Sequence, residues 1–217
     1  MEDKDSTEGV RVLSLDGGGP GCFSQLVILD EIMARIAHDK QLDKKQMRLA
    51  DYFDLMVSLD RYIGFMLGAL RMTVKDAMKE LHSLGSKLML GDTDVQVSPT
   101  ERVDTLKSGI RQMLRNQGVS EDVDLQDPRF SSSGCKVQWF RTYPSSRSNI
   151  ECSVVDALSA SMALPTLFST VTVGPEYAQE GFCGGGLGFN NPTRELLKEA
   201  QLVYGGERRL SVILSVG

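Results

Sequence analysis

The chain of 217 residues lacks the features that mark several classes of protein. Its longest apolar run, Ile63 to Leu70, is far shorter than the roughly 18 residues that a membrane span requires, so we expect no transmembrane helix. The first residues are acidic and polar, which argues against a signal peptide and favours a cytoplasmic location. Basic residues number 24 against 29 acidic ones, and the net charge of -5 makes a nucleic acid an unfavourable partner.

Cysteine and histidine are also sparse. His38 and His82 both fall in amphipathic helical patterns, where we expect surface positions, and a Ser-His-Asp triad would depend on one of them. The cysteines form no CxxC pair and are distant from the histidines in sequence, so we predict free thiols, no zinc site and no other cofactor. The four cysteines are Cys22, Cys135, Cys152 and Cys183.

Glycine is abundant, with 21 residues, and one cluster, Gly17, Gly18, Gly19 and Gly21, separates an expected strand from an expected helix. Backbone N–H groups in such a turn can bind an anion or an oxyanion. A P-loop would need Lys-Ser/Thr after the glycines, and a dinucleotide fingerprint would need glycine at Cys22. An oxyanion hole formed by Gly17 to Gly19 is the third interpretation, and a tight turn without a ligand is the fourth.

Apolar patterning predicts strands and helices that alternate along the chain. The expected strands cover residues 10–15, 53–57, 135–140 and 210–216, and those at 53–57 and 210–216 are expected to be buried. The expected helices begin near residues 24, 63, 73, 98, 153 and 191. Two of these helices, at 73 and 98, begin with capping-box patterns, and a solvated loop is expected over 116–134. This alternation predicts an α/β fold with a largely parallel central sheet, formed by residues 9–217 as one domain after a disordered segment 1–8.

Several segments together resemble the patatin-like lipid acyl hydrolases, in the order in which that family has them. The segments are Leu13 to Gly19, Tyr52 to Leu55, Met66 to Met72, Phe140 to Pro144, Ala160 to Thr166 and Gly185 to Pro192. The resemblance implies a three-layer fold around a largely parallel sheet. It also implies a serine–aspartate dyad without histidine, with the serine on a GxSxG elbow between a strand and a helix, and with an oxyanion hole at Gly17, Gly18 and Gly19.

Both members of the implied dyad are altered in this chain. In place of the family's Gly-Thr-Ser-Thr-Gly-Gly, residues 58–65 read Ser-Leu-Asp-Arg-Tyr-Ile-Gly-Phe. Aligned from the strand, Asp60 takes the place of the nucleophilic serine; aligned from the helix, Ser58 does. The family's aspartate falls on Gly184, with Glu180 the nearest carboxylate that could replace it. We also expect a missing or shortened strand and a truncated C-terminus.

These substitutions predict a patatin-like domain, of phospholipase A or lysophospholipase ancestry, that is catalytically silent because nucleophile and base are both lost. The alternative is an active lipid acyl hydrolase with a rebuilt site, in which Ser58 is the nucleophile and Asp60 or Glu180 the base. A third alternative is a degenerate or spliced relative of low stability. A lipid or acyl-ester ligand and peripheral membrane contact are the expected interactions, and the sequence indicates no particular protein partner.

Overall fold

The computed structural model describes residues 9–17, 22–89, 97–125, 152–165, 167–184 and 191–217. Its centre is a three-stranded parallel sheet in the order β2-β1-β5. The strands are β1 (Val10–Leu15), β2 (Leu55–Ser58) and β5 (Leu210–Val216). The predicted α/β class with a parallel sheet is therefore confirmed for the described residues, while the expected strand at 135–140 lies outside them.

The helices begin close to the residues that the sequence predicts. They are α1 (Cys22–Lys40), α2 (Arg61–Gly64), α3 (Val74–Met89), α4 (Pro99–Asn116), α6 (Val154–Met162) and α7 (Thr193–Tyr204). The helix expected from residue 63 begins at Arg61 and continues as a π-helical segment, η4 (Phe65–Ala69). Two short 3-10 turns, η2 (Lys44–Gln46) and η3 (Leu49–Asp51), connect α1 to β2. None of the helices in the described ranges has the length and apolarity needed to cross a membrane.

The sheet separates two hydrophobic clusters. On one face, Leu13, Leu15 and Met56 pack into the larger cluster with α1, α3, α4 and α6. On the other face, α7 packs against the sheet in a small cluster. That cluster contains Val10, Val12, Leu55, Val57, Leu196 and Ala200. Alternate residues of a strand point to opposite faces, which explains why both faces of β1 and β2 are apolar.

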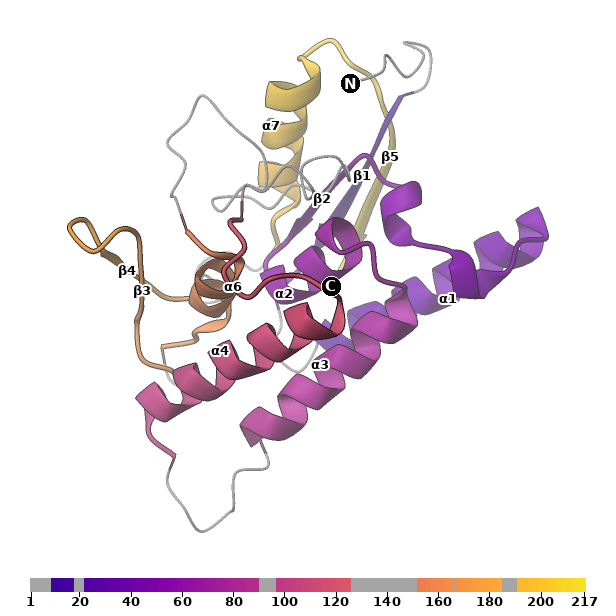
Figure 1. The fold of residues 1–217 in the computed structure, drawn as a ribbon. Coiled ribbons are helices and arrows are strands. Elements are labelled where there is room, and N and C mark those ends of the chain that lie inside the picture. The colour runs from indigo at the N-terminus through magenta and orange to yellow at the C-terminus, as the bar shows by residue number, and fades with distance from the viewer. Residues whose placement is uncertain (1–8, 18–21, 90–96, 126–151, 166, 185–190) are drawn as a thin grey trace.

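A short antiparallel hairpin was not predicted. Its strands are β3 (Val171–Val173) and β4 (Glu180–Phe182), which lie apart from the main sheet in Figure 1. Val171 and Val173 are buried against the larger cluster, whereas the intervening residue faces outward. Strands of three residues are too short for alternation to stand out in a sequence.

The prediction that residues 210–216 form a buried strand is wrong in one respect. The strand forms, but Val212 and Ile213 are 44% and 51% exposed. Within the described residues β5 pairs only with β1, so it is an edge strand whose faces are incompletely covered. A continuous apolar run predicts a strand but cannot distinguish a central strand from an edge.

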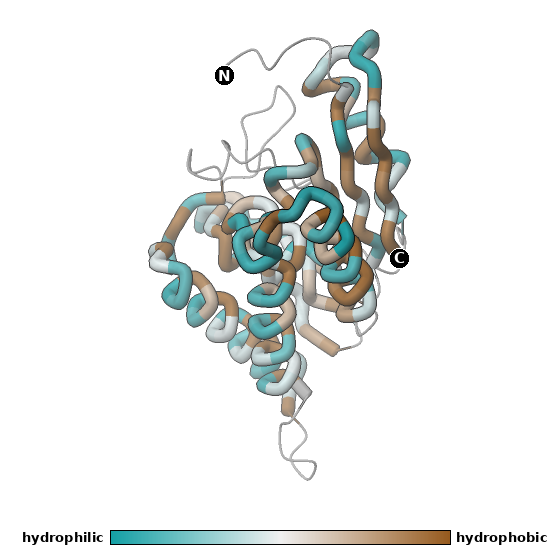
Figure 2. Tube along the Cα trace, turned by 90° about the vertical axis from the view of Figure 1, so that its right-hand side faces the viewer, coloured by the Kyte–Doolittle hydropathy of each residue, from teal (hydrophilic) through white to brown (hydrophobic). Residues whose placement is uncertain are grey.

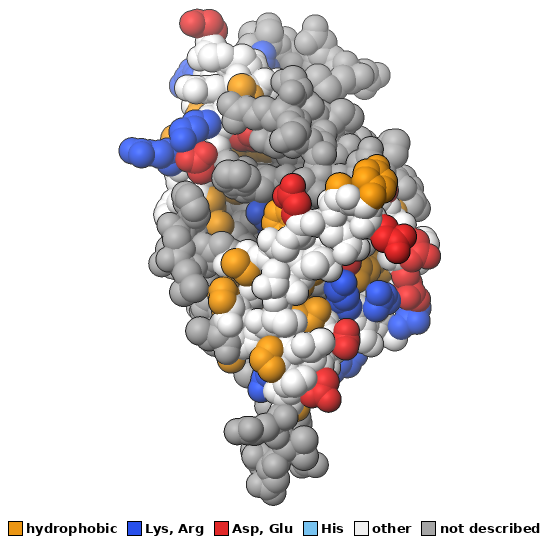
Figure 3. Space-filling model, turned by 90° about the vertical axis from the view of Figure 1, so that its left-hand side faces the viewer, with side chains coloured by type: hydrophobic (Ala, Val, Ile, Leu, Met, Phe, Trp, Pro, Cys, Tyr) orange, Lys and Arg blue, Asp and Glu red, His pale blue; other side chains and the backbone are white. Residues whose placement is uncertain are grey.

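The histidines and the described cysteines are as the sequence predicted. His38 and His82 are exposed on α1 and α3. Cys22 is buried, Cys152 partly buried and Cys183 exposed, and all three are free thiols, as predicted; Cys135 lies outside the described residues. The side of the molecule that carries α4 and α6 shows acidic and basic side chains interspersed (Figure 3).

The capping box of α4 forms as predicted. The Ser98 hydroxyl accepts from the Glu101 amide at 3.2 Å, and the Glu101 carboxylate accepts from the Ser98 amide at 2.8 Å. We expect Ser98→Ala to lower the free energy of unfolding by about 1 kcal/mol, because it leaves a helix N–H without its acceptor. Urea unfolding followed by circular dichroism measures this loss. Ser108→Ala, at an exposed position inside the same helix, is the control, and an equal loss there would contradict the capping role.

Candidate functional site

The carboxyl ends of the three parallel strands meet at one edge of the sheet. Leu15 lies opposite Ser58 on one side and Val216 on the other. The chain stays joined just beyond the strands, since the Asp16 amide donates to the Val216 carbonyl at 3.0 Å and the Leu59 amide to the Leu15 carbonyl at 3.1 Å. This edge is where open parallel sheets bind ligands, and it contains several of the predicted site residues.

Gly17 begins the glycine turn and contacts the turn after β2. A Cβ at Gly17 would lie 3.4 Å from both Cβ and Cδ1 of Leu59, so the two turns touch. Gly18 and Gly19 lie outside the described residues, and the oxyanion hole predicted for Gly17 to Gly19 therefore stays a prediction. What the structure does place is the start of this glycine turn beside the end of β2.

Ser58, the predicted nucleophile candidate, is the last residue of β2 and is only 4% exposed. Its Oγ donates to the backbone carbonyl of Asp60 at 2.6 Å. Gly64 of α2 packs directly on it, because a Cβ at Gly64 would lie 2.8 Å from the Ser58 Cβ. The hydroxyl is thus held by a carbonyl, which cannot take its proton as a general base would.

Asp60 lies between β2 and α2, at the N-cap position of the helix. Its backbone angles, φ −80° and ψ 89°, are outside the left-handed region. Two non-glycine residues in the described chain have a positive φ, Gln41 and Arg71, and neither is in this turn. Its Oδ1 is buried without a hydrogen-bond partner. Burial raises the pKa of the Asp60 carboxyl, and the Cys22 thiol and the amides of Ile63 and Tyr62 lower it by less.

The raised pKa of Asp60 predicts a pH-dependent stability difference. A carboxyl whose pKa is higher in the folded than in the unfolded state opposes folding when it is ionised, and this opposition fades as the pH falls toward the unfolded value of about 4. We therefore expect Asp60→Asn to raise the free energy of unfolding by on the order of 1 kcal/mol at pH 7, and to have less effect near pH 4. Urea unfolding of both proteins across this range measures the difference.

Asp104→Asn, at an exposed position in α4, is the control for this substitution. It should change stability little at either pH, because surface substitutions away from special contacts have small effects. A stabilisation by Asp60→Asn that persists unchanged at pH 4 would contradict the assignment to an ionised, buried carboxyl.

Gly184, the predicted position of the lost aspartate, is buried against the C-terminal end of α6. Its amide donates to the Ala163 carbonyl at 2.7 Å. A Cβ at this position would lie 2.7 Å from the carbonyl oxygen of Ser161 and 3.4 Å from the carbonyl group of Ala163. The backbone therefore occupies the space that any side chain at 184 would need.

Glu180, the alternative base, is exposed on β4, where it pairs with Val173. Within the described residues no hydrogen bond joins Glu180 to Ser58. The structure thus brings Ser58, Asp60 and Gly17 together at the sheet edge, whereas Glu180 lies on the β3–β4 hairpin.

Two further polar residues lie at this edge and were not singled out as site residues. The side-chain amide of Gln25, on α1, donates to the backbone carbonyl of Asp16 at 2.9 Å. The side-chain amide of Asn191 donates to Asp16 Oδ2 at 3.2 Å. Asp16 Oδ1 and Gln25 Oε1 are buried without hydrogen-bond partners. Burial raises the pKa of Asp16, and the bond from Asn191 lowers it by less. A glutamine on the buried face of α1, next to a glycine turn, is the signal that could have indicated Gln25.

The edge offers few ligands for a metal ion. Among the described residues no group of three or more histidine, cysteine, aspartate or glutamate side chains is arranged to hold one.

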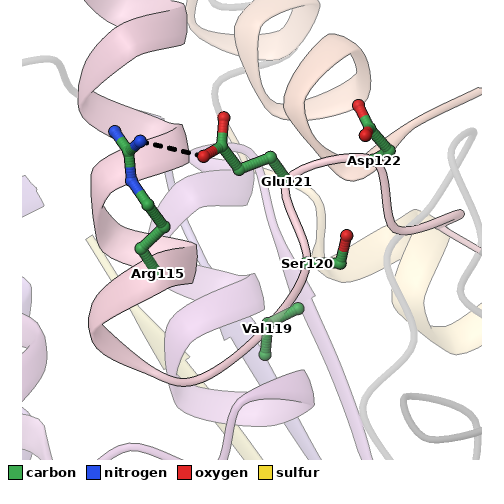
Figure 4. A pocket seen from close by; sticks show the side chains of 5 residues that line it. All are labelled: Arg115, Val119, Ser120, Glu121 and Asp122. Carbon is green, nitrogen blue, oxygen red and sulfur yellow. Dashed lines mark ion pairs between the residues drawn. The ribbon is translucent and has the colours of Figure 1, made fainter.

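A separate shallow hollow lies at the end of α4, where Arg115 and Glu121 form an ion pair at 2.9 Å (Figure 4). An exposed ion pair of this kind contributes little to stability, and the hollow adds no catalytic group to the sheet edge.

Comparison with known proteins adds no family to this description: no protein-family model and no curated protein matches the chain. The described residues define an α/β protein with a parallel sheet, whose candidate site lies at the carboxyl edge of that sheet.

Proposed function

We propose that the chain is a patatin-like domain that has lost its serine–aspartate dyad and no longer hydrolyses acyl esters. The observation that carries this proposal is the turn between β2 and α2. There Asp60 stands at the strand-to-helix junction, where a GxSxG elbow would place its serine. This favours the alignment from the strand, with Ser58 two residues before the nucleophile position.

The environment of Ser58 supports the same proposal. Its hydroxyl donates to a carbonyl, it is almost wholly buried, and Gly64 lies against it. An activated serine needs a base that accepts its proton and a substrate path to its Oγ. Neither is provided for Ser58 by the contacts of the described residues.

The packing of Gly184 supports the loss of the base. The carbonyl oxygens at the end of α6 fill the space around its Cα, so the local backbone is arranged for a residue without a side chain. Loss of both dyad members removes the acyl-enzyme route. Binding of a lipid or acyl ester, peripheral membrane contact and a cytoplasmic location belong to this proposal as its expected setting.

A fluorophosphonate probe tests the proposal on the full chain. We expect no labelling and no hydrolysis of a p-nitrophenyl ester by the parent protein. Asp60→Ser, which restores a serine at the junction, should also stay unlabelled because no base is supplied. The rival function, an active hydrolase that uses Ser58, is supported instead if the parent is labelled at Ser58 and loses hydrolysis in Ser58→Ala but not in Ser215→Ala, an exposed serine at the same edge.

A further inference from the structure

The outer edge of β5 has no partner strand among the described residues. One edge of the strand pairs with β1 from Leu210 to Val216, and no backbone hydrogen bond within the described ranges joins its other edge to another segment. The Ser215 hydroxyl accepts hydrogen bonds from the side chains of Asn191 and Thr193 at 3.4 and 3.1 Å. Val212 and Ile213 at its centre are 44% and 51% exposed. Figure 2 views the molecule from this side, and brown hydrophobic segments separated by pale ones follow the strand to its C-terminal end.

The strand also lacks most of the features that usually protect an edge. Its sequence, LSVILSV, contains no charged residue and no proline over seven residues. Its one irregularity of register is a bulge at Ser211, the residue left unpaired between Leu210, which pairs with Val10, and Val212, which pairs with Arg11, and it lies near the start of the strand, away from Ile213. Natural edge strands are usually shortened, charged, bulged or covered, because unpaired N–H and C=O groups bind other strands.

Both faces of this edge present apolar side chains. Val212 pairs in register with Arg11 and so points to the same face as Leu13 and α1, whereas Ile213 pairs with Val12 and points to the face that carries α7. A strand added beside β5 would therefore cover apolar surface on both sides of the sheet as well as its unpaired backbone groups.

We propose that β5 pairs with β5 of a second copy of this chain, antiparallel, about a two-fold axis at Ile213. In this register Ile213 faces its own equivalent, Val212 faces Leu214, and Ser211 faces Ser215, so every opposed pair is uncharged. The pairing joins the two described three-stranded sheets through β5, and the β5 edge of each copy is occupied by the other, so association along this edge ends at a dimer.

The charges at the two ends of β5 favour the antiparallel direction. Exposed Arg209 precedes the strand, and Asp16 lies beside its carboxyl end, where the Asp16 amide is bonded to Val216. Antiparallel pairing brings the basic end of each copy toward the acidic end of the other. Parallel pairing would set two copies of Arg209 side by side, and like charges directly opposed are unfavourable.

Sedimentation velocity of the full chain over a range of concentrations tests the proposal. We expect a monomer–dimer equilibrium, and we expect Ile213→Lys and Ile213→Glu each to raise the dissociation constant by about tenfold or more, because each places like charges opposite one another at the axis. An equimolar mixture of the two variants should dimerise again, since lysine then faces glutamate. Leu202→Lys, 57% exposed on α7, is the matched control and should dimerise as the parent does.

Three outcomes would overturn the proposal. The first is a parent chain that stays monomeric at all concentrations tested. The second is a dimer that both Ile213 variants retain, or that their mixture fails to restore. The third is a monomer that binds phosphatidylcholine vesicles and loses that binding in Ile213→Lys, which would make the exposed strand a lipid contact. Circular dichroism of each variant confirms that the fold is kept.

Discussion

Gly64→Ala should lower the free energy of unfolding by about 2 kcal/mol, although alanine favours helix formation over glycine by roughly 1 kcal/mol. A Cβ at this position would lie 2.8 Å from the Cβ of Ser58, an atom fixed to the backbone of β2 that cannot rotate away. The strand or α2 must therefore shift within a buried part of the sheet. Urea unfolding measures the loss.

Two variants distinguish this contact from a general effect of the substitution. Gly85→Ala, in α3, has no atom within 4 Å of the new Cβ, so we expect a gain of about 0.5 kcal/mol or more from helix propensity alone. Ser58→Gly combined with Gly64→Ala removes the atom that is struck, and should recover most of the loss seen in the single Gly64 variant. A stable Gly64→Ala protein would show that β2 and α2 are not held as closely as described.

Gly184→Asp, which restores the carboxylate of the patatin-like pattern, should destabilise the protein by on the order of 3 kcal/mol without creating hydrolysis. The new Cβ would lie 2.7 Å from the Ser161 carbonyl oxygen, and the carboxylate would be placed among carbonyl oxygens that repel it. Thermal and urea unfolding measure the stability, and a p-nitrophenyl ester assay measures the activity.

Gly184→Ala and Gly206→Asp separate the two contributions. Gly184→Ala has the steric conflict without the charge, so it should lose part of the stability that Gly184→Asp loses. Gly206 is exposed and has no atom within 4 Å of a new Cβ, so Gly206→Asp should have little effect. Ester hydrolysis by Gly184→Asp combined with Asp60→Ser would argue that the site was only two substitutions from activity, and would contradict the closed packing at 184.

The sequence predicted the helices well where the local signals were strong. The capping box at Ser98 and Glu101 is a short-range feature, and α4 begins where it predicts and ends at Asn116, where the loop was expected to start. The exposure of β5 could not be predicted, because it depends on which strands pair with it. The hairpin of β3 and β4 was missed because each of its strands has only three residues, too few for an alternating pattern to stand out.

The candidate site also has features that the sequence indicated and others that only the structure shows. The sequence put Gly17 after one expected strand and Ser58 after the next, but only the parallel register shows that these strands are neighbours, with Leu15 opposite Ser58 and Gly17 against Leu59. The sequence could not show that the Ser58 hydroxyl binds a carbonyl, or that the Asp60 carboxyl has a buried oxygen without a partner. Nor could it show that Gly184 has no room for a side chain, because that space is limited by the backbone of α6.

Because the sheet separates the small cluster under α7 from the large cluster on its other face, α7 can detach from the sheet by itself. Helix α7 is held by a cluster of six buried residues and by the hydrogen bond from Tyr204 to the Asp54 carbonyl at 2.8 Å, whereas α4 and α6 share the large cluster on the other face. Detachment of α7 would leave that large cluster intact, so the amide protons of α7 can exchange with solvent without global unfolding. Amides in the middle of α4 would then report the stability of the whole domain, and those of α7 only the strength of its own attachment.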